Sequence, residues 1–515
     1  MVAAIQPAQA AAPVAPAKPR NVIFVLVDDL RYDAMGFLTK GLQTPNIDHL
    51  AKNGAYFPNA MVTSALSSPS RATILTGLSA RNHRIIDNNN SSEDGLTFFP
   101  QYLQQAGYQT AFFGKWHMGV DNPQPRPGFN HWVGFNGQGT YFPTDELTPQ
   151  ELAAGKRNTL NVNGKTVPQQ GYITDELTDY AMDWLERGRD RSKPFFLYLS
   201  HKAVHSAPTP PERYRHQYAD LKIPLPASMA DTEDNYRGKP MWVRNQRNSW
   251  HGVDFMFHSG RKLTEYIREY YRTLTPVDDS VGRVLDYLRR NKLEDSTTVI
   301  FYSDNGFILG EHGLIDKRNA YEPSVRVPLV VYAPGLVPAG KVVEQRVLNL
   351  DIAPTIMDMA RVPAPPQFEG RSFLALATGA APASAWKERD FVYEYYWEWN
   401  FPQSPTTFAI VSDGYKYIQY HGIWDLDELY DLRGDPNEMR NLASEPEQAA
   451  RKKELRAALF VHLANNKGDH VIPYSHRTGT GNVLRNKDGA KGALFPAQWD
   501  RKALWPIPYP PPDRP

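Results

Sequence analysis

NVIFVLVDD, residues 21–29, is a continuous apolar run that ends in two carboxylates. Such a run predicts a strand buried on both faces of a parallel sheet. Further strands are predicted at 110–113, 194–200, 297–303 and 327–332. Helices are predicted between them, at 45–54, 67–77, 99–106, 174–187, 263–291 and 351–360, with Pro276 interrupting the fifth. Strands that alternate with helices predict an α/β fold, a large and mostly parallel sheet sandwiched by helices.

The pattern changes near residue 390. Residues 391–399 and 408–420 read as antiparallel strands, 428–442 as a turn-rich segment, and 445–465 as an amphipathic helix. We therefore expect a flexible lead-in over 1–20, a main domain over 21–388, and a smaller α+β subdomain over 389–515 that ends in a Pro-rich tail. Residues 121–139 are expected to form a surface loop, and 208–253 an irregular insertion.

Composition excludes several classes of protein. The chain has 515 residues, a net charge of +1 and no cysteine. The near-zero charge argues against a nucleic-acid partner bound by bulk electrostatics, and the missing cysteines exclude disulfides and thiolate metal sites. No apolar run has the length of a membrane span. The first twenty residues do not read as an intact signal peptide, so a signal is expected to be absent or removed.

The stretch SSPSRATILTG, residues 67–77, predicts a helix start. Ser67 or Ser68 can cap the free N–H groups, and Pro69 suits the first turn. A hydroxyl at a helix N-terminus, with Arg71 one turn further on, forms a site for an anion. The simpler interpretation of these residues alone is a capped helix with a solvated arginine.

Polar residues follow several predicted strands. Asp28 and Asp29 end one, and Asp304 and Asn305 end another; oxygen ligands of this kind suit Ca²⁺ or Mg²⁺, although each pair alone could simply cap a loop. Four cationic or histidine side chains also occur at or shortly after strand ends: Lys115, His117, His205 and Lys317. Arg71 lies in the helix predicted at 67–77. Together they would form a pocket for a tetrahedral oxyanion such as sulfate, phosphate or phosphonate.

These motifs resemble those of the type I sulfatases of the alkaline phosphatase superfamily. The first family signature, Cys/Ser-x-Pro-x-Arg followed by Leu-Thr-Gly, corresponds to residues 67–77, and the second to GYQTAFFGKWH at 107–117. SDNG at 303–306 with His312-Gly313 and Lys317, and ELYDL at 428–432 with Asp435-Pro436, also match. The resemblance extends from about residue 20 to about residue 445 and makes the main domain a sulfatase catalytic domain.

The resemblance implies a mechanism. Ser67 would be converted to formylglycine by a sulfatase-maturing enzyme, and its gem-diol would attack sulfur and later eliminate sulfate. Asp28, Asp29, Asp304 and Asn305 would hold Ca²⁺. Arg71, Lys115 and Lys317 would bind the nucleophile and the sulfate oxygens, and His117 would assist turnover of the gem-diol. His205 would protonate the leaving oxygen, although SHKAVHSAP at 200–208 departs from the family pattern by one residue and keeps His201 as an alternative.

Serine at position 67 is either the natural residue or an engineered replacement of cysteine. Some bacterial members carry serine there, and a recombinant Cys→Ser change would look identical. An unmodified Ser67 would bind sulfate esters but turn them over poorly. The family's location implies a periplasmic or secreted bacterial protein. A phosphonate or phosphodiester hydrolase and a catalytically dead binder of sulfated glycans are the competing functions.

The expected substrate is a sulfated saccharide. RNHRIIDNNN at 81–90, followed by Phe98 to Pro100, is similar to N-acetylglucosamine-6-sulfatases. This resemblance favours 6-O-sulfated N-acetylglucosamine, with another polysaccharide or glycosaminoglycan sulfate as the alternative. The candidate sugar-binding residues are Asp87, Asn88, Asn89, His312, Arg318 and Trp399.

Overall fold

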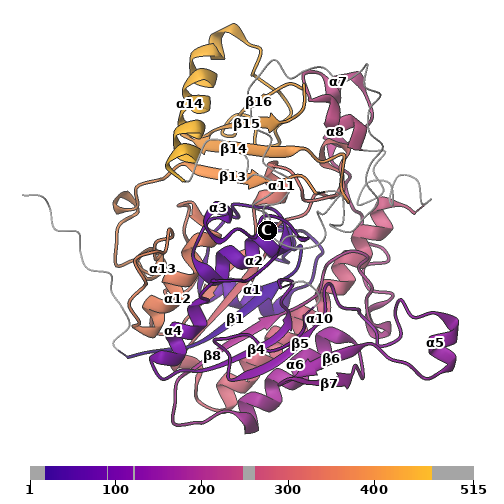
Figure 1. Ribbon diagram of the computed structural model, residues 1–515, viewed down its shortest axis with the longest axis vertical. Helices are drawn as coiled ribbons and strands as arrows, with labels where there is room; N and C mark the ends of the chain where they lie inside the picture. The colour runs from indigo at the N-terminus through magenta and orange to yellow at the C-terminus, as the bar shows by residue number, and fades with distance from the viewer. Residues whose placement is uncertain (1–17, 90, 120–121, 247–260, 399, 467–515) are drawn as a thin grey trace, which may run out of the picture.

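The structure is a computed structural model that describes residues 18–89, 91–119, 122–246, 261–398 and 400–466. It consists of a large sheet with helices on both faces and a smaller sheet that packs beside it (Figure 1). This arrangement confirms the predicted α/β class with an additional antiparallel sheet. No helix among the described residues is long and apolar enough to cross a membrane.

Strand β1 (Asn21–Val27) lies at the centre of the ten-stranded sheet. It pairs in parallel with β8 (Phe195–Ser200) on one side and β9 (Thr297–Ser303) on the other. Alternate residues of β1 enter two separate cores: Val22, Phe24 and Leu26 face one side, and Ile23, Val25 and Val27 the other. The unbroken apolar run is therefore explained by burial on both faces.

The sheet is parallel in its centre and mixed toward its edges. Its order is β11-β2-β10-β9-β1-β8-β4-β5-β6-β7. The remaining strands are β2 (Ala55–Tyr56), β4 (Gln109–Lys115), β5 (His131–Phe135), β6 (Thr159–Val162), β7 (Lys165–Pro168), β10 (Leu329–Tyr332) and β11 (Lys341–Val342). Since β1, β8, β9 and β4 run in parallel, their carboxyl ends meet at one edge, where ligands bind in sheets of this kind.

Two groups of helices cover the two faces of the sheet. Helices α2 (Ser67–Thr76), α4 (Phe99–Gln105), α12 (Ile352–Ala360) and α13 (Leu374–Thr378) pack on one face. Helices α1 (Pro45–Lys52), α6 (Ile173–Asp183) and α10 (Leu263–Arg290) pack on the other. The remaining short elements of the main domain are β3 (Ala60–Met61), α3 (Ala80–His83), α5 (Pro149–Ala153), α11 (Glu322–Val325) and β12 (Val347–Leu348).

Two predictions for the main domain are wrong. Residues 121–139 are not entirely surface loop, because β5 lies within them and its Trp132 and Val133 are buried. Pro276 does not interrupt the helix predicted over 263–291: α10 continues through it. Leu274, Val277 and Val281 bury one face of α10 against the sheet, and this packing outweighs the lost backbone hydrogen bond.

The predicted insertion over 208–253 contains only short elements among its described residues. They are two 3₁₀ turns at Glu212–Tyr214 and Ala227–Met229 and the helices α7 (Glu233–Tyr236) and α8 (Met241–Asn245). At the start of the described chain, Arg20 is buried. Its guanidinium donates to Thr297 O at 2.9 Å and to Thr298 Oγ1 at 3.2 Å.

The C-terminal sheet is a four-stranded antiparallel meander covered by α14 (Ala449–Asn465). Its strands are β13 (Phe391–Tyr395), β14 (Thr406–Ser412), β15 (Tyr415–His421) and β16 (Glu428–Asp431). The single strand expected over 408–420 is wrong, because Asp413 (φ 46°) and Gly414 (φ 78°) form a tight turn that splits it into β14 and β15. The turn-rich segment over 428–442 begins with β16.

Candidate active site

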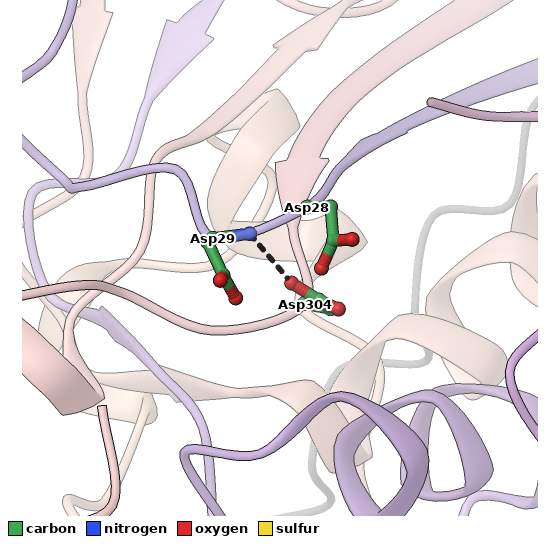
Figure 2. Close-up of side chains that lie close together, drawn as sticks. All are labelled: Asp28, Asp29 and Asp304. Carbon is green, nitrogen blue, oxygen red and sulfur yellow. Dashed lines mark hydrogen bonds between the residues drawn. The ribbon is translucent and has the colours of Figure 1, made fainter. Parts of the chain in front are cut away.

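Three carboxylates meet where β1 and β9 end. Asp28 and Asp29 follow β1, Asp304 follows β9, and their side chains point toward one another (Figure 2). One oxygen from each lies within 4.8 Å of the others. The backbone N–H of Asp29 donates to Asp304 Oδ1 at 3.0 Å, and Asp29 has a φ of 62°. The predicted convergence of these residues is therefore present in the fold.

Asn305 completes this cluster. Its Nδ2 donates to Asp29 Oδ1 at 2.7 Å and to Gly306 O at 2.8 Å, whereas its Oδ1 is buried and has no hydrogen-bond partner among the described residues. A buried acceptor without a donor is costly. Three carboxylates and a free amide oxygen form the ligand set of a hard divalent cation, so the residues present fit Ca²⁺ or Mg²⁺.

Each carboxylate also contacts a different cationic side chain. Lys115 Nζ donates to Asp28, Lys317 Nζ donates to Asp29, and Arg71 Nε donates to Asp304 Oδ2 at 2.9 Å. Burial would raise the pKa of Asp28, but the charges of Lys115, His205 and Arg71 outweigh it and hold that pKa well below its usual range. Asp28 is therefore ionised at neutral pH.

Ser67 is buried among these groups. Its Oγ donates to Asp28 Oδ1 at 3.3 Å and accepts from Lys317 Nζ at 3.2 Å. Ser67 is the first residue of α2, and the residue in the capping position is Leu66. The expectation that Ser67 or Ser68 caps this helix is thus wrong, because both lie inside it: the Ser67 hydroxyl is directed into the charged cluster and that of Ser68 toward His117. Gly77 (φ 66°) ends the helix as expected.

The two candidate histidines after β8 lie in different environments. His205 Nε2 is 3.8 Å from Asp29 Oδ2, at the edge of the cluster. His201 is fully buried, and within the part of the chain that the structure describes neither of its ring nitrogens has a hydrogen-bond partner. His117, from the end of β4, is close to α2: its Nδ1 is 3.4 Å from Ser68 Oγ, which also donates to His117 O. The geometry thus places His205 and His117, but not His201, beside the charged groups.

The loop with Asp87, Asn88 and Asn89 reaches the N-terminus of α2. Asn88 Oδ1 accepts from the N–H of Ser68 at 3.0 Å. Asp87 is buried and its Oδ1 accepts from the N–H of Asn89 at 2.8 Å, while Asn89 Nδ2 donates to Asn400 Oδ1 at 3.0 Å. One hydrogen bond therefore joins this loop to Ser68, the residue that follows Ser67.

The other three predicted sugar-binding residues differ in their surroundings. Arg318 is buried in a salt bridge network, with Nε 2.6 Å from Glu398 Oε2 and Nη1 2.9 Å from Asp316 Oδ1. The His312 ring packs against the Tyr321 ring, with 4.2 Å between the ring centroids, and its Nδ1 has no hydrogen-bond partner in the described ranges. Trp399 lies outside the described residues.

The site has two further contacts, and only Glu398 lies in a stretch that the sequence marks as a candidate lining of the sugar pocket. Gln138 Oε1 accepts from Lys115 Nζ at 2.6 Å. Glu398 is fully buried and accepts from Arg318, from the N–H of Asn88 at 3.3 Å and from Tyr395 OH at 3.2 Å. Glu398 could be found from the sequence, because it is an acid within the aromatic run YYWEW at 395–399. No pattern around Gln138 indicated that it contacts the site.

Comparisons with known proteins show which chains this one resembles. The sulfatase family model matches residues 20–362, and the model of the C-terminal part of N-sulphoglucosamine sulphohydrolase matches residues 310–465. An N-acetylglucosamine-6-O-sulfatase of Bacteroides thetaiotaomicron is 32% identical over 86% of each chain. The goat (Capra hircus) N-acetylglucosamine-6-sulfatase is 28% identical, over 82% of this chain and 80% of its own.

A solved structure described as a complex with its substrate, D-glucosamine-2-N,6-O-disulfate, superimposes with a TM-score of 0.76. Its chain is 31% identical, and the match covers 87% of the present chain and 98% of the other. The similarity therefore extends over almost the whole described chain.

Proposed function

The chain belongs to the sulfatase family, and we propose that it hydrolyses a sulfate ester of a carbohydrate, with 6-O-sulfated N-acetylglucosamine or a related glycan unit as the substrate. The names of two relatives, both N-acetylglucosamine-6-sulfatases, support this choice of sugar. Other O-sulfated polysaccharides and glycosaminoglycans are the alternatives.

The position of Ser67 carries the proposal. Its hydroxyl lies 3.3 Å from Asp28 Oδ1 and 3.2 Å from Lys317 Nζ, at the N-terminus of a ten-residue helix. A nucleophile in this place faces positive charge from Lys317, Lys115 and Arg71, which would hold the sulfate oxygens and stabilise the charge that develops on them. Conversion of Ser67 to formylglycine would supply an aldehyde hydrate whose second hydroxyl allows sulfate to leave, which a serine ester lacks.

The metal proposed for the carboxylate cluster is Ca²⁺, held by Asp28, Asp29, Asp304 and Asn305. The partnerless buried Oδ1 of Asn305 supports this assignment. When bound, the ion would add positive charge beside the sulfate oxygens and favour an ionised nucleophile.

His205 is proposed to give a proton to the leaving sugar oxygen. A sugar alkoxide is a poor leaving group, so general acid catalysis is needed. Burial and the charge of Lys115 lower the pKa of His205 well below its usual range. The charge of Asp28 opposes this lowering of the pKa, because a nearby carboxylate favours the protonated ring. His117 is proposed to assist turnover from its place beside Ser68.

The sugar is proposed to contact the loop with Asp87, Asn88 and Asn89 together with Arg318. The hydrogen bond from Ser68 N–H to Asn88 supports this, because it sets the loop at the nucleophile end of α2. His312 and Trp399 are proposed to contact the same sugar. A sulfatase-maturing enzyme is the proposed protein partner, and a periplasmic or secreted location is proposed for the bacterial protein.

Two measurements test this function. Mass spectrometry of the peptide with Ser67, from the native host, should detect loss of two hydrogens or the corresponding hydrate. Sulfate release should then be measured on sugars sulfated at single positions, and 6-O-sulfated N-acetylglucosamine should react fastest. Unmodified serine throughout would exclude the hydrolase, and turnover of phosphonate esters above that of sulfate esters would assign the phosphonate alternative.

A further inference from the structure

Lys202 is a largely buried cation whose Nζ keeps some accessible surface and has no hydrogen-bond or ion-pair partner in the described part of the chain. Only 5% of the residue is exposed, yet its ammonium group makes no hydrogen bond and no ion pair there. Its sole close contact of a polar kind is the face of the Tyr141 ring, 4.8 Å from Nζ to the ring centroid. A buried ammonium group normally has a counter-ion, because its desolvation is costly.

Lys202 lies beside the proposed acid His205. The N–H of His205 donates to Lys202 O at 3.1 Å, so the two residues share one turn after β8. The hydroxyl of Tyr141, whose ring contacts Lys202 Nζ, donates to His205 O at 2.7 Å. Tyr141 therefore sets the lysine and the histidine next to each other, on the side where His205 approaches Asp29.

The acidic groups near Lys202 are already matched or solvated. Asp28 and Asp29 contact Lys115 and Lys317. Asp145 accepts from the N–H of Phe142 at 2.8 Å, and Glu146 is exposed. Burial lowers the pKa of Lys202, while Asp28, Glu146, Asp29 and Asp145 oppose this shift at longer range. None of them neutralises the ammonium group by contact.

We infer that Lys202 binds a second anionic group of the substrate, a sulfamate, sulfate or carboxylate on the sulfated sugar or on its neighbour. The inference rests on the proposed function, because it places this group beside the leaving oxygen that His205 serves. A charge-assisted hydrogen bond from Lys202 Nζ to such an anion would supply the missing counter-ion. The preferred substrate is then doubly anionic.

Calorimetry tests whether Lys202 binds a second anionic group. The protein used carries unconverted Ser67, so the ligands are bound but not hydrolysed. Three ligands are compared: N-acetylglucosamine 6-sulfate, glucosamine 2-N,6-O-disulfate, and N-acetylglucosamine 6-sulfate linked to glucuronate. We expect the native protein to bind at least one doubly anionic ligand about tenfold or more tightly than the first. Lys202→Met should reduce this preference to within twofold and leave the affinity for N-acetylglucosamine 6-sulfate nearly unchanged.

Lys193→Met is the matched control. Lys193 precedes the amino end of β8, is exposed, and its loss removes the same charge at the opposite end of the same strand. The Lys193→Met variant should keep the full preference for the doubly anionic ligand. Glu146→Gln tests the alternative that Lys202 pairs with Glu146 when the side chains move.

The outcomes separate the two proposals. Equal binding of all three ligands by the native protein, an unchanged preference in Lys202→Met, or the same loss in Glu146→Gln would each overturn the role of Lys202. Failure of every 6-sulfated ligand to bind the native protein would instead overturn the proposed function and, with it, this inference.

Discussion

Arg71 Nε donates to Asp304 Oδ2 at 2.9 Å, between side chains that are each at most 1% exposed. The same guanidinium donates through Nη1 to Lys115 O and Ser200 Oγ, both at 2.7 Å. One side chain of α2 thus joins the ends of β9, β4 and β8. Arg71 therefore holds α2, which begins with Ser67, against the carboxyl edge of the sheet.

Substitution of Arg71 should therefore destabilise the fold as well as the site. Arg71→Ala leaves the buried Asp304 without its cation, and we expect the free energy of unfolding to fall by about 3–5 kcal/mol. Denaturant unfolding measures this change. Arg187→Ala, at an exposed ion pair on the surface, should change the same quantity by less than about 0.5 kcal/mol. Equal losses in both variants would contradict the structural role of Arg71.

Removal of the metal should lower the melting temperature. A chelator leaves the carboxylates of Asp28, Asp29 and Asp304 without the ion that binds only the folded state, so added Ca²⁺ should restore the midpoint. Asn305→Ala should weaken Ca²⁺ binding on the order of tenfold, as measured by calorimetry. Asp179→Asn, at an exposed ion pair of α6, should leave Ca²⁺ affinity unchanged. A chelator without effect would argue against the site.

Replacement of His205 should affect substrates according to their leaving group. His205→Ala should lower kcat on a sugar sulfate by about 10²–10⁴-fold, because the alkoxide then leaves without a proton. The loss should be much smaller for an aryl sulfate, whose phenolate needs no acid. His201→Asn serves as the comparison. If it reproduced the dependence on the leaving group, His201 would be the acid.

The buried histidines predict a loss of stability in acid. Burial lowers the pKa of His201 to about 3, against about 6.5 in the unfolded chain. The unfolded chain therefore binds more protons between these values, and the free energy of unfolding falls as pH drops below 6.5. From pH 7.5 to 5 this histidine accounts for about 2 kcal/mol. Urea unfolding of His201→Leu should lose that much less over the same range; an identical slope would exclude His201 as a cause.

Glu398 should act on substrate binding more than on chemistry. It accepts from Arg318 Nε at 2.6 Å and from Asn88 N–H at 3.3 Å, and so orients two candidate sugar contacts. Glu398→Gln keeps the size but removes the charge, and we expect KM to rise about tenfold with kcat changed less than threefold. Glu388→Gln, at an exposed ion pair, should change neither constant. A fall in kcat alone would contradict this role.

The sequence predicted the main sheet well because its signals are local. The apolar runs at 21–29, 194–200 and 297–303 are too long and too uniform for a half-exposed strand. By contrast β5 follows a Pro- and Gly-rich stretch and has one aliphatic residue, so its pairing with β4 could not be read from periodicity. The division of 408–420 into two strands depends on the positive φ angles of only two residues, Asp413 and Gly414, which form the turn between them.

The sequence by itself determined which residues could do chemistry. Asp28, Asp29, Asp304 and Asn305 end strands of one parallel sheet, and the carboxyl ends of such strands must meet. Only the tertiary structure decided how these groups are paired. Ser67 faces Asp28 and Lys317 instead of capping its helix, and His205, not His201, lies near Asp29. Lys202 has no hydrogen-bond or ion-pair partner among the described residues. The physical reason is that strand ends follow from local pattern, whereas side-chain pairing depends on the packing of segments hundreds of residues apart.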